Sequence, residues 1–312
     1  MLKVDITVVG SLNMDIVAVV DHVPQAGETV KTPHAHLYTG GKGANQAIAA
    51  ARHGARVRMV GAVGADAFAT TLRAVLQSSG GDVSGLVEKR GPSGMALITV
   101  ESDGQNRIVV CEGANRMLTP RDVERACSAS PWPPGSALVV QNEIPMETVR
   151  HALDVAHRRG WRVIWNVAPV VPVEAGLLGE GDVIVVNESE ASELVGMDVA
   201  DIETGRMACE RLLKLGPGMA IVTLGAAGSI AVSSAWGIMS TPAYQVVPVD
   251  TTAAGDTFLG VFAADWDGVT SPERSLQIAS AAAAVCVTRQ GAQDSIPTRE
   301  DVISFLKQYE TA

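Results

Sequence analysis

The residues best suited to do chemistry lie in the stretch Val249-Asp-Thr-Thr-Ala-Ala-Gly-Asp-Thr-Phe258. The pattern predicts the end of a strand, a turn of small residues and the start of an apolar helix. The first amides of a helix lack intrahelical partners and lie at its positive end. We therefore expect the N–H groups of Ala254, Gly255 and Asp256 to point at one anion site. A carboxylate in such a site suits one task, taking a proton from a hydroxyl that attacks a phosphoryl group.

Helix capping is the alternative explanation of this stretch. Asp is favoured in the first turn of any helix, so a lone Gly-Asp-Thr would more often be a cap than a base. Ten ordered residues with two Asp, three Thr and a Gly are less easily explained in that way.

Two further stretches suit a ligand with several hydroxyl groups. In Gly10-Ser-Leu-Asn-Met-Asp15, residues Asn13 and Asp15 share a face if the segment is extended. One carboxylate can accept from two neighbouring hydroxyls. Taken alone, however, the pattern is better explained as a polar turn after a strand. In Gly40–Ala47, Lys42 is followed by Gly43 and not by Ser or Thr, which excludes a P-loop. Its glycines allow close backbone approach to a ligand, and Asn45 can point to the same pocket, unless this is only a flexible turn.

Two weaker patterns suit a nucleotide and its metal ion. Asn187 and Glu190 lie one turn apart at a predicted helix start, and could hold a hydrated Mg²⁺ beside phosphates. The same spacing is that of a capping box, and both interpretations can hold together. Thr223-Leu-Gly225-Ala-Ala-Gly228 offers backbone amides to a nucleotide, but alone it indicates only a turn.

The elements that must position these residues alternate along the chain. Near-continuous apolar strands separated by helices predict a mostly parallel α/β sheet covered on both faces, with the site at the carboxyl ends of the strands. The expected strands are Ile6–Gly10, Val57–Val63, Leu138–Gln141, Val163–Asn166, Val183–Asn187 and Ala220–Leu224. The expected helices include Ala44–His53, Ala65–Ser79, Met146–Arg159, Glu188–Val195 and Glu203–Leu215.

Two segments break this alternation. Residues 15–39 contain Asp15–Val20, a Pro24–Gly27 turn and Thr29–Tyr38, and residues 91–111 contain Met95–Glu101, an Asp103-Gly104 turn and Arg107–Cys111. Both resemble antiparallel hairpins, which predicts a small β-sheet that stands apart as a lid. No linker or repeat divides the chain, so we expect a single domain, 1–312, carrying this lid.

Composition narrows the class of protein. The 312 residues are 47% hydrophobic and carry a net charge of −10, so there is no basic footprint for nucleic acid or an anionic membrane surface. The N-terminus has no signal-peptide pattern, and Ala279–Val287 is too short to span a bilayer. The four cysteines form no C-x-x-C pair, which predicts reduced thiols in a cytoplasmic protein.

These motifs, in this order, resemble the ribokinase/pfkB family of sugar kinases. The stretch at the predicted helix start is typical of the family, and Asn13 and Asp15 together with Gly-Lys-Gly-Ala-Asn-Gln are typical of its ribokinase branch. The resemblance runs nearly end to end. Its other motifs are Gly61–Asp66, Gly113-Ala-Asn115, Gln141-Asn-Glu143, Asn187–Glu190, Thr223–Gly228 and Thr288–Ser295.

The resemblance implies an open α/β sheet with a β lid, a homodimer formed by crossing lids, and phosphorylation of D-ribose at its 5-hydroxyl by Mg-ATP with potassium activation. Asp256 would be the base, with Ala253, Ala254 and Gly255 as the anion hole. The sugar contacts would be Asn13, Asp15, Gly41, Lys42, Gly43, Ala44, Asn45 and Glu143. The nucleotide and Mg²⁺ contacts would be Asn187, Glu190, Thr223, Leu224, Gly225, Ala226, Ala227, Gly228 and Ser280. The K⁺ positions would be Asp250, Thr252, Cys286, Arg289, Gly291 and Ser295, several of them through carbonyls.

Departures from the family pattern leave the charges of the chemistry intact. Asn166-Val-Ala-Pro169 replaces a more usual Asn-Pro-Ala-Pro, Ser93-Gly94 stands where Thr-Gly is common, and Ser280 is smaller than usual near the adenine. Three alternatives to a ribose kinase stand beside this resemblance. A kinase for 2-deoxyribose, fructose or adenosine differs in the sugar. A sugar-binding regulator without chemistry has no need of Asp256, Asn187 and Glu190. A nicotinamide oxidoreductase lacks its G-x-G-x-x-G fingerprint here.

Overall fold

The computed structural model describes residues 3–101 and 106–311. Within them, strands and helices alternate much as the apolar pattern predicts. The strands of the main sheet are β1 (Asp5–Val9), β4 (Arg56–Val63), β5 (Asp82–Glu88), β8 (Ala137–Gln141), β9 (Arg162–Asn166), β10 (Val183–Asn187), β11 (Met219–Thr223), β12 (Ser229–Ser233) and β13 (Gly237–Thr241). The helices are α1 (Lys42–Arg52), α2 (Ala67–Ser78), α3 (Pro120–Ser128), α4 (Met146–Arg158), α5 (Glu188–Val195), α6 (Ile202–Leu212), α7 (Ala254–Asp265), α8 (Glu273–Val287) and α9 (Arg299–Thr311).

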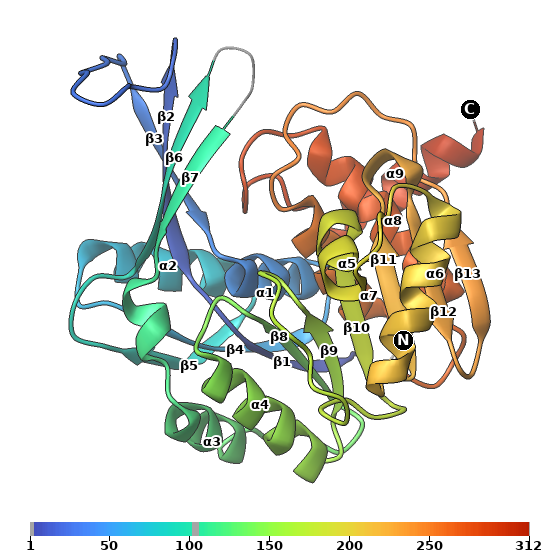
Figure 1. Cartoon of the computed structure of the whole chain (residues 1–312). Coiled ribbons are helices and arrows are strands. Elements are labelled where there is room, and N and C mark those ends of the chain that lie inside the picture. Colours follow the sequence, from blue (N-terminus) through green and yellow to red (C-terminus); the bar gives the residue numbers. More distant parts are fainter. Residues whose placement is uncertain (1–2, 102–105, 312) are drawn as a thin grey trace.

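The main sheet is the middle of three layers (Figure 1). Its strand order is β13-β12-β11-β10-β9-β8-β1-β4-β5, and neighbours pair in parallel from β5 to β11, whereas β12 and β13 pair antiparallel. One apolar cluster joins one face of the sheet to α1, α2, α7 and α8, and a second joins the other face to α3, α4, α5 and α6. The predicted mostly parallel α/β sheet covered on both faces is confirmed.

The topology brings the polar ends of several strands to one edge. Gln141, Asn166, Asn187 and Thr223 are the last residues of β8, β9, β10 and β11. Because these strands are parallel, their carboxyl ends meet along one edge of the sheet, where open α/β sheets bind ligands. Helix α1 follows the glycine-rich segment that begins at Gly40, and α7 follows the turn that ends at Ala253. The two helices pack against each other beside this edge of the sheet.

The second sheet has four strands among the described residues: β2 (Asn13–Val20), β3 (Ala35–Gly40), β6 (Gly94–Glu101) and β7 (Asn106–Cys111), in the order β3-β2-β6-β7. Both predicted hairpins are confirmed as antiparallel pairs, and β2 also pairs in parallel with β6. The strands rise away from the main sheet (Figure 1). The predicted Asp103-Gly104 turn lies outside the described residues.

One predicted strand begins too early. Thr29–Tyr38 was expected as a strand, but β3 starts only at Ala35. Pro33 has no N–H to donate to a ladder, which explains why the segment before it does not pair.

Two predictions drawn from composition can be compared with the structure. None of the helices in the described part of the chain is long and apolar enough to cross a membrane. Cys111, Cys127, Cys209 and Cys286 are all free thiols.

Candidate active site

The turn before α7 has an unusual backbone. Ala253 adopts a left-handed conformation with φ 61°, the one non-glycine residue with positive φ in the described part of the chain. This conformation costs an L-residue roughly 1–2 kcal/mol and is typical of functional turns. The N–H groups of Gly255 and Asp256 make no hydrogen bond with the described residues. The Ala254 N–H was expected to be free but donates to Thr251 O at 3.3 Å.

Asp256 is buried in the first turn of α7, and both of its carboxylate oxygens accept hydrogen bonds from α1. Asn45 Nδ2 donates to Oδ2 at 2.9 Å, and Gln46 Nε2 donates to Oδ1 at 2.8 Å. Two helices from distant parts of the sequence therefore meet at this carboxylate. Asp256 does not cap α7, since no side chain caps that helix. Helix capping is therefore not the explanation of this stretch.

Lys42 is the cation of the site. It lines a polar cavity of about 220 Å³ together with Asp256, Gly255, Asn187 and Glu190. Burial lowers the pKa of its ammonium group, but the negative Asp256, Glu143 and Glu190 outweigh this and raise it, so Lys42 stays charged. A fixed positive charge at this point can neutralise a transferring phosphoryl group.

Glu143 supports the loop that carries Lys42. Its Oε2 accepts from Ser11 Oγ at 2.5 Å and from the backbone N–H of Lys42 at 3.0 Å. Gly41 precedes α1 with φ 91°, and a side chain on Gly43 would meet Ser11 N at 2.6 Å. Glycine is therefore required at both positions, because the loop passes directly against the end of β1.

Asp15 is the carboxylate without a partner. It makes no hydrogen bond to any described side chain or backbone group, and burial, with Glu143 and Asp256 adding negative charge, raises its pKa to about 7. Asn13, in contrast, accepts at Oδ1 from Asn115 Nδ2 at 2.7 Å, which leaves its own amide N–H₂ available. A half-buried, unpartnered acceptor beside a fixed amide is suited to hydroxyl groups of a ligand.

This pKa gives a testable pH dependence. A raised pKa means that Asp15 of the free protein is protonated below about pH 7 and loses acceptor capacity there. Since kcat/KM reports ionisations of the free enzyme, kcat/KM for the sugar should fall as the pH drops through about 7, approaching tenfold per pH unit. Initial rates across this range, with Asp15→Asn as a control lacking this ionisation, check the prediction. A profile that stays flat in the unsubstituted protein would contradict it.

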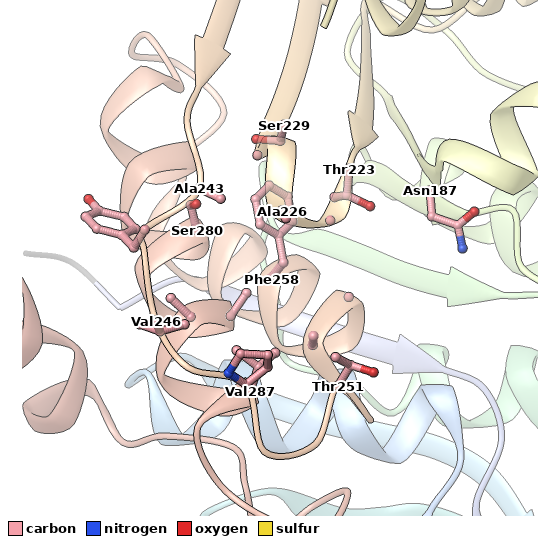
Figure 2. A pocket seen from close by; sticks show the side chains of 18 of the residues that line it. Asn187, Thr223, Ala226, Ser229, Ala243, Val246, Thr251, Phe258, Ser280 and Val287 are labelled. Atoms are coloured by element: carbon pink, nitrogen blue, oxygen red, sulfur yellow. The ribbon is translucent and has the colours of Figure 1, made fainter. Parts of the chain in front are cut away.

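A larger cavity of about 430 Å³ adjoins the polar one. Thr223, Ala226, Ser229, Ser280, Phe258 and Val287 surround it from β11, the turn after it, β12, α7 and α8 (Figure 2). Gly225, Gly228 and Gly255 also line it, whereas Ala227 does not, and Leu224 packs in the apolar core. An apolar cavity with a few polar groups and free backbone amides fits a nucleotide base.

Asn187 and Glu190 form the capping box that the sequence left open. Asn187 Oδ1 accepts from Glu190 N at 2.8 Å, and Glu190 Oε2 accepts from Asn187 N at 2.9 Å. Both residues also line the polar cavity. Burial raises the pKa of Glu190, and the hydrogen bond from the Asn187 N–H and the charge of Lys42 partly offset this. The cap and a role beside phosphates are therefore compatible, since Glu190 Oε1 and Asn187 Nδ2 are not used by the cap.

The six residues expected around a potassium ion fall into two groups. Asp250 accepts from Thr252 N and Gly291 N, both at 2.9 Å, and Cys286 Sγ lies 3.1 Å from Ser295 Oγ and 3.7 Å from Thr252 O. These five residues come from the segment before α7, the end of α8 and the loop after it, and form one cluster, the Asp250 cluster. Thr257 Oγ1 of α7 donates to Cys286 Sγ at 3.4 Å, which joins this cluster to the first turn of α7. The Arg289 side chain instead points to Asp301 at 3.2 Å, so only its backbone remains for an ion.

Four amide side chains that the sequence did not single out complete the site. Asn115 holds Asn13, and Gln46, Gln141 and Gln293 connect to Asp256 through hydrogen bonds. All four lie inside motifs that carried the family resemblance. Their position in those motifs was the available signal, but which partner each amide contacts depends on tertiary packing.

The fold and the site together define an enzyme that transfers a phosphoryl group to an alcohol. A base-sized cavity leads to a polar pocket with one lysine, a helix N-terminus and a buried carboxylate. The chain belongs to the pfkB family of carbohydrate kinases, whose family model matches residues 3–299.

Individual relatives agree over nearly the whole chain. A ribokinase of Haemophilus influenzae is 35% identical over 98% of this chain and 99% of its own length. A deoxyribokinase of Salmonella typhi is 35% identical over 97% and 98%. The solved Arabidopsis thaliana ribokinase complexed with ribose and ATP superposes with a TM-score of 0.86 at 31% identity, covering 98% and 99%. The chain is thus a ribokinase-type sugar kinase, a phosphotransferase with an alcohol group as acceptor.

Proposed function

We propose that the protein phosphorylates D-ribose at the 5-hydroxyl group with Mg-ATP as donor. The observation that carries the proposal is the position of Asp256, at the N-terminus of α7 and in the wall of the polar cavity that adjoins the nucleotide-sized one. A hydroxyl bound there would lie between a carboxylate that takes its proton and amides that receive the phosphoryl group.

Each part of the site has a role in this proposal. Asp15 and Asn13 hold ring hydroxyls, while Gly41, Lys42, Gly43, Ala44, Asn45 and Glu143 shape the sugar loop. Asp256 removes the proton of the attacking hydroxyl, and the N–H groups of Gly255 and its neighbours stabilise charge on the transferring group. The cavity in Figure 2 binds the base of ATP.

Two metal ions fit the residues present. Asn187 and Glu190 would position Mg²⁺, which neutralises phosphate charge and prefers few protein carboxylates. The Asp250 cluster offers a carboxylate, a hydroxyl and several carbonyls, the hard oxygen ligands that suit K⁺. Among the described residues no group of three or more His, Cys, Asp or Glu is placed to hold a metal ion.

The second candidate is a kinase for 2-deoxyribose. It is favoured by the relative named deoxyribokinase, which is as similar as the ribokinase quoted above. Rates with ribose, 2-deoxyribose, fructose and adenosine, each with Mg-ATP, decide between the sugars. Ribose should have the highest kcat/KM, and a higher value for any other acceptor would overturn the assignment.

Potassium should raise the activity. An ion held near Asp250 would lie next to the turn that begins α7, and would order its amides without touching the sugar. We expect kcat to increase when sodium is replaced by potassium at constant ionic strength. Equal rates in the two salts would count against a selective site, and Asp250→Asn provides the matched variant that should lose the difference.

The four-stranded sheet should close over the sugar as a lid and pair with a second lid. Asp15 shares one face of the sheet with Ile98, so Leu97 lies on the opposite face. On that face Leu37, Ile16, Leu97 and Val109 form one cross-strand row, with Leu37 59% and Val109 61% exposed. Such an apolar row favours burial against a partner, and a two-fold dimer closes the assembly.

Light scattering and hydrogen exchange test this arrangement. We expect a homodimer in solution, and slower exchange in residues 15–39 and 91–111 when ribose binds. A monomer at micromolar concentration would refute the dimer, whereas unchanged exchange would refute the closing lid.

Location in the cytoplasm stays a prediction, which the four free thiols support.

A further inference from the structure

We infer that Gln46 is a positioning residue that fixes the carboxylate of Asp256. It belongs to a network of hydrogen-bonded amide side chains, the amide relay, whose two arms each donate to one oxygen of that carboxylate. This inference rests on the proposed role of Asp256 as base. Gln46 makes no contribution of its own to proton transfer, and it acts through the orientation of Asp256.

The first arm of the relay starts at a backbone carbonyl of β10. Asn166 Nδ2 donates to Val185 O at 3.1 Å, so Asn166 Oδ1 must face the other way. That oxygen accepts from Gln46 Nε2 at 3.1 Å, and the same nitrogen donates to Asp256 Oδ1 at 2.8 Å. Because a carbonyl can only accept, the hydrogen-bond direction is set along the whole arm.

Gln141 locks the orientation of the Gln46 amide from the other side. Its Nε2 donates to Gln46 Oε1 at 2.5 Å. The oxygen of the Gln46 amide therefore faces Gln141, and its nitrogen faces Asp256. Gln46 and Gln141 are both buried, at 1% and 0% exposed, so water cannot replace either partner freely. A flipped Gln46 amide would lose all three of its hydrogen bonds and place an oxygen against a carboxylate.

The second arm starts at the backbone carbonyl of Gly40, in the sugar loop. Gln293 Nε2 donates to Gly40 O at 3.2 Å and to Asn45 Oδ1 at 3.1 Å. Asn45 Nδ2 then donates to Asp256 Oδ2 at 2.9 Å. Each carboxylate oxygen of Asp256 thus carries one amide donor and keeps further lone-pair capacity for the hydroxyl of the substrate.

The two helices that carry the relay, α1 and α7, approach each other closely at Gly260. A Cβ on Gly260 of α7 would meet Gln46 O at 2.5 Å and the Ala49 side chain at 2.6 Å. The close crossing of α1 and α7 therefore sets the distance between Gln46 and Asp256. In a reaction that depends on alignment, a misplacement of about 1 Å can cost roughly 100-fold in rate.

The test is the substitution Gln46→Met, which keeps the length of the side chain and removes its amide. We expect kcat to fall by about 10- to 100-fold while KM for the sugar changes less than about threefold, because Gln46 does not touch the sugar. Gln141→Met should give a smaller fall in kcat, since Gln46 stays but can turn. Gln77→Met, at an exposed position of α2, is the matched control and should change neither constant.

Structure determination gives a readout that does not depend on turnover. In a crystal structure of Gln46→Met the Asp256 carboxylate should leave its present rotamer or occupy two. A folded Gln46→Met protein with unchanged kcat, or with Asp256 unmoved, would overturn the relay. If the unsubstituted protein fails to phosphorylate ribose, the proposed function fails instead, and the relay is tested with whichever sugar turns over or by the crystal structure alone.

Discussion

Asp256→Asn should lower kcat by roughly two to four orders of magnitude, the usual contribution of a well-placed general base. The amide cannot take a proton from the attacking hydroxyl. Its nitrogen would also face one of the two donors, Asn45 or Gln46, that now bind the carboxylate. Single-turnover and steady-state rates with saturating ribose and Mg-ATP measure the loss.

The control for this substitution is nucleotide binding. Asp256 is not among the residues that line the 430 Å³ cavity, so the affinity for ATP should stay within a few-fold of the unsubstituted protein. If kcat of Asp256→Asn remained near its original value, Asp256 would not be the base. If ATP affinity fell in parallel with kcat, a disturbed turn before α7 would explain the loss.

Asp15→Ala should raise KM for ribose by about 10- to 150-fold, because hydrogen bonds to a charged group contribute about 1.5–3 kcal/mol. Its carboxylate has no hydrogen-bond partner among the described residues, so the substitution leaves no other group of the protein unpaired. The effect on kcat should be smaller, since Asp256 and its donors are untouched.

The same variant identifies the hydroxyl. If Asp15 accepts from the 2-hydroxyl, the loss with 2-deoxyribose should be smaller than the loss with ribose. Equal losses with the two sugars would contradict this assignment. Asp15→Asn separates charge from shape, because the amide retains the volume and one acceptor oxygen.

The fold could be predicted where one strong local signal sufficed. Strands such as β10, with the apolar run Val183–Val186, are buried on both faces and show it in composition alone. The two hairpins were found from turn residues. The parallel pairing of β2 with β6 was not, because it joins segments about 80 residues apart, which no local pattern encodes.

The site divides in a similar way. Residues with unusual chemistry for their place, such as Lys42 between glycines and Asp256 at a helix start, were visible in the sequence. Gln46, Gln141 and Gln293 were not, since a glutamine gains a role only from the partners that the fold brings to it. The Ala254 N–H was expected to be free, but it donates to Thr251 O. That hydrogen bond depends on the left-handed turn at Ala253, which the sequence did not predict.

The central claim is that this site transfers the terminal phosphoryl group of ATP to the 5-hydroxyl of ribose. The most direct measurement is phosphorus NMR of the product formed from ribose and Mg-ATP, with the coupling of phosphorus to the sugar protons resolved. The site described above predicts one ADP per sugar phosphate and coupling to the two protons on carbon 5. Coupling to a proton on carbon 1, 2 or 3, or phosphate released from ATP without any sugar phosphate, would contradict it.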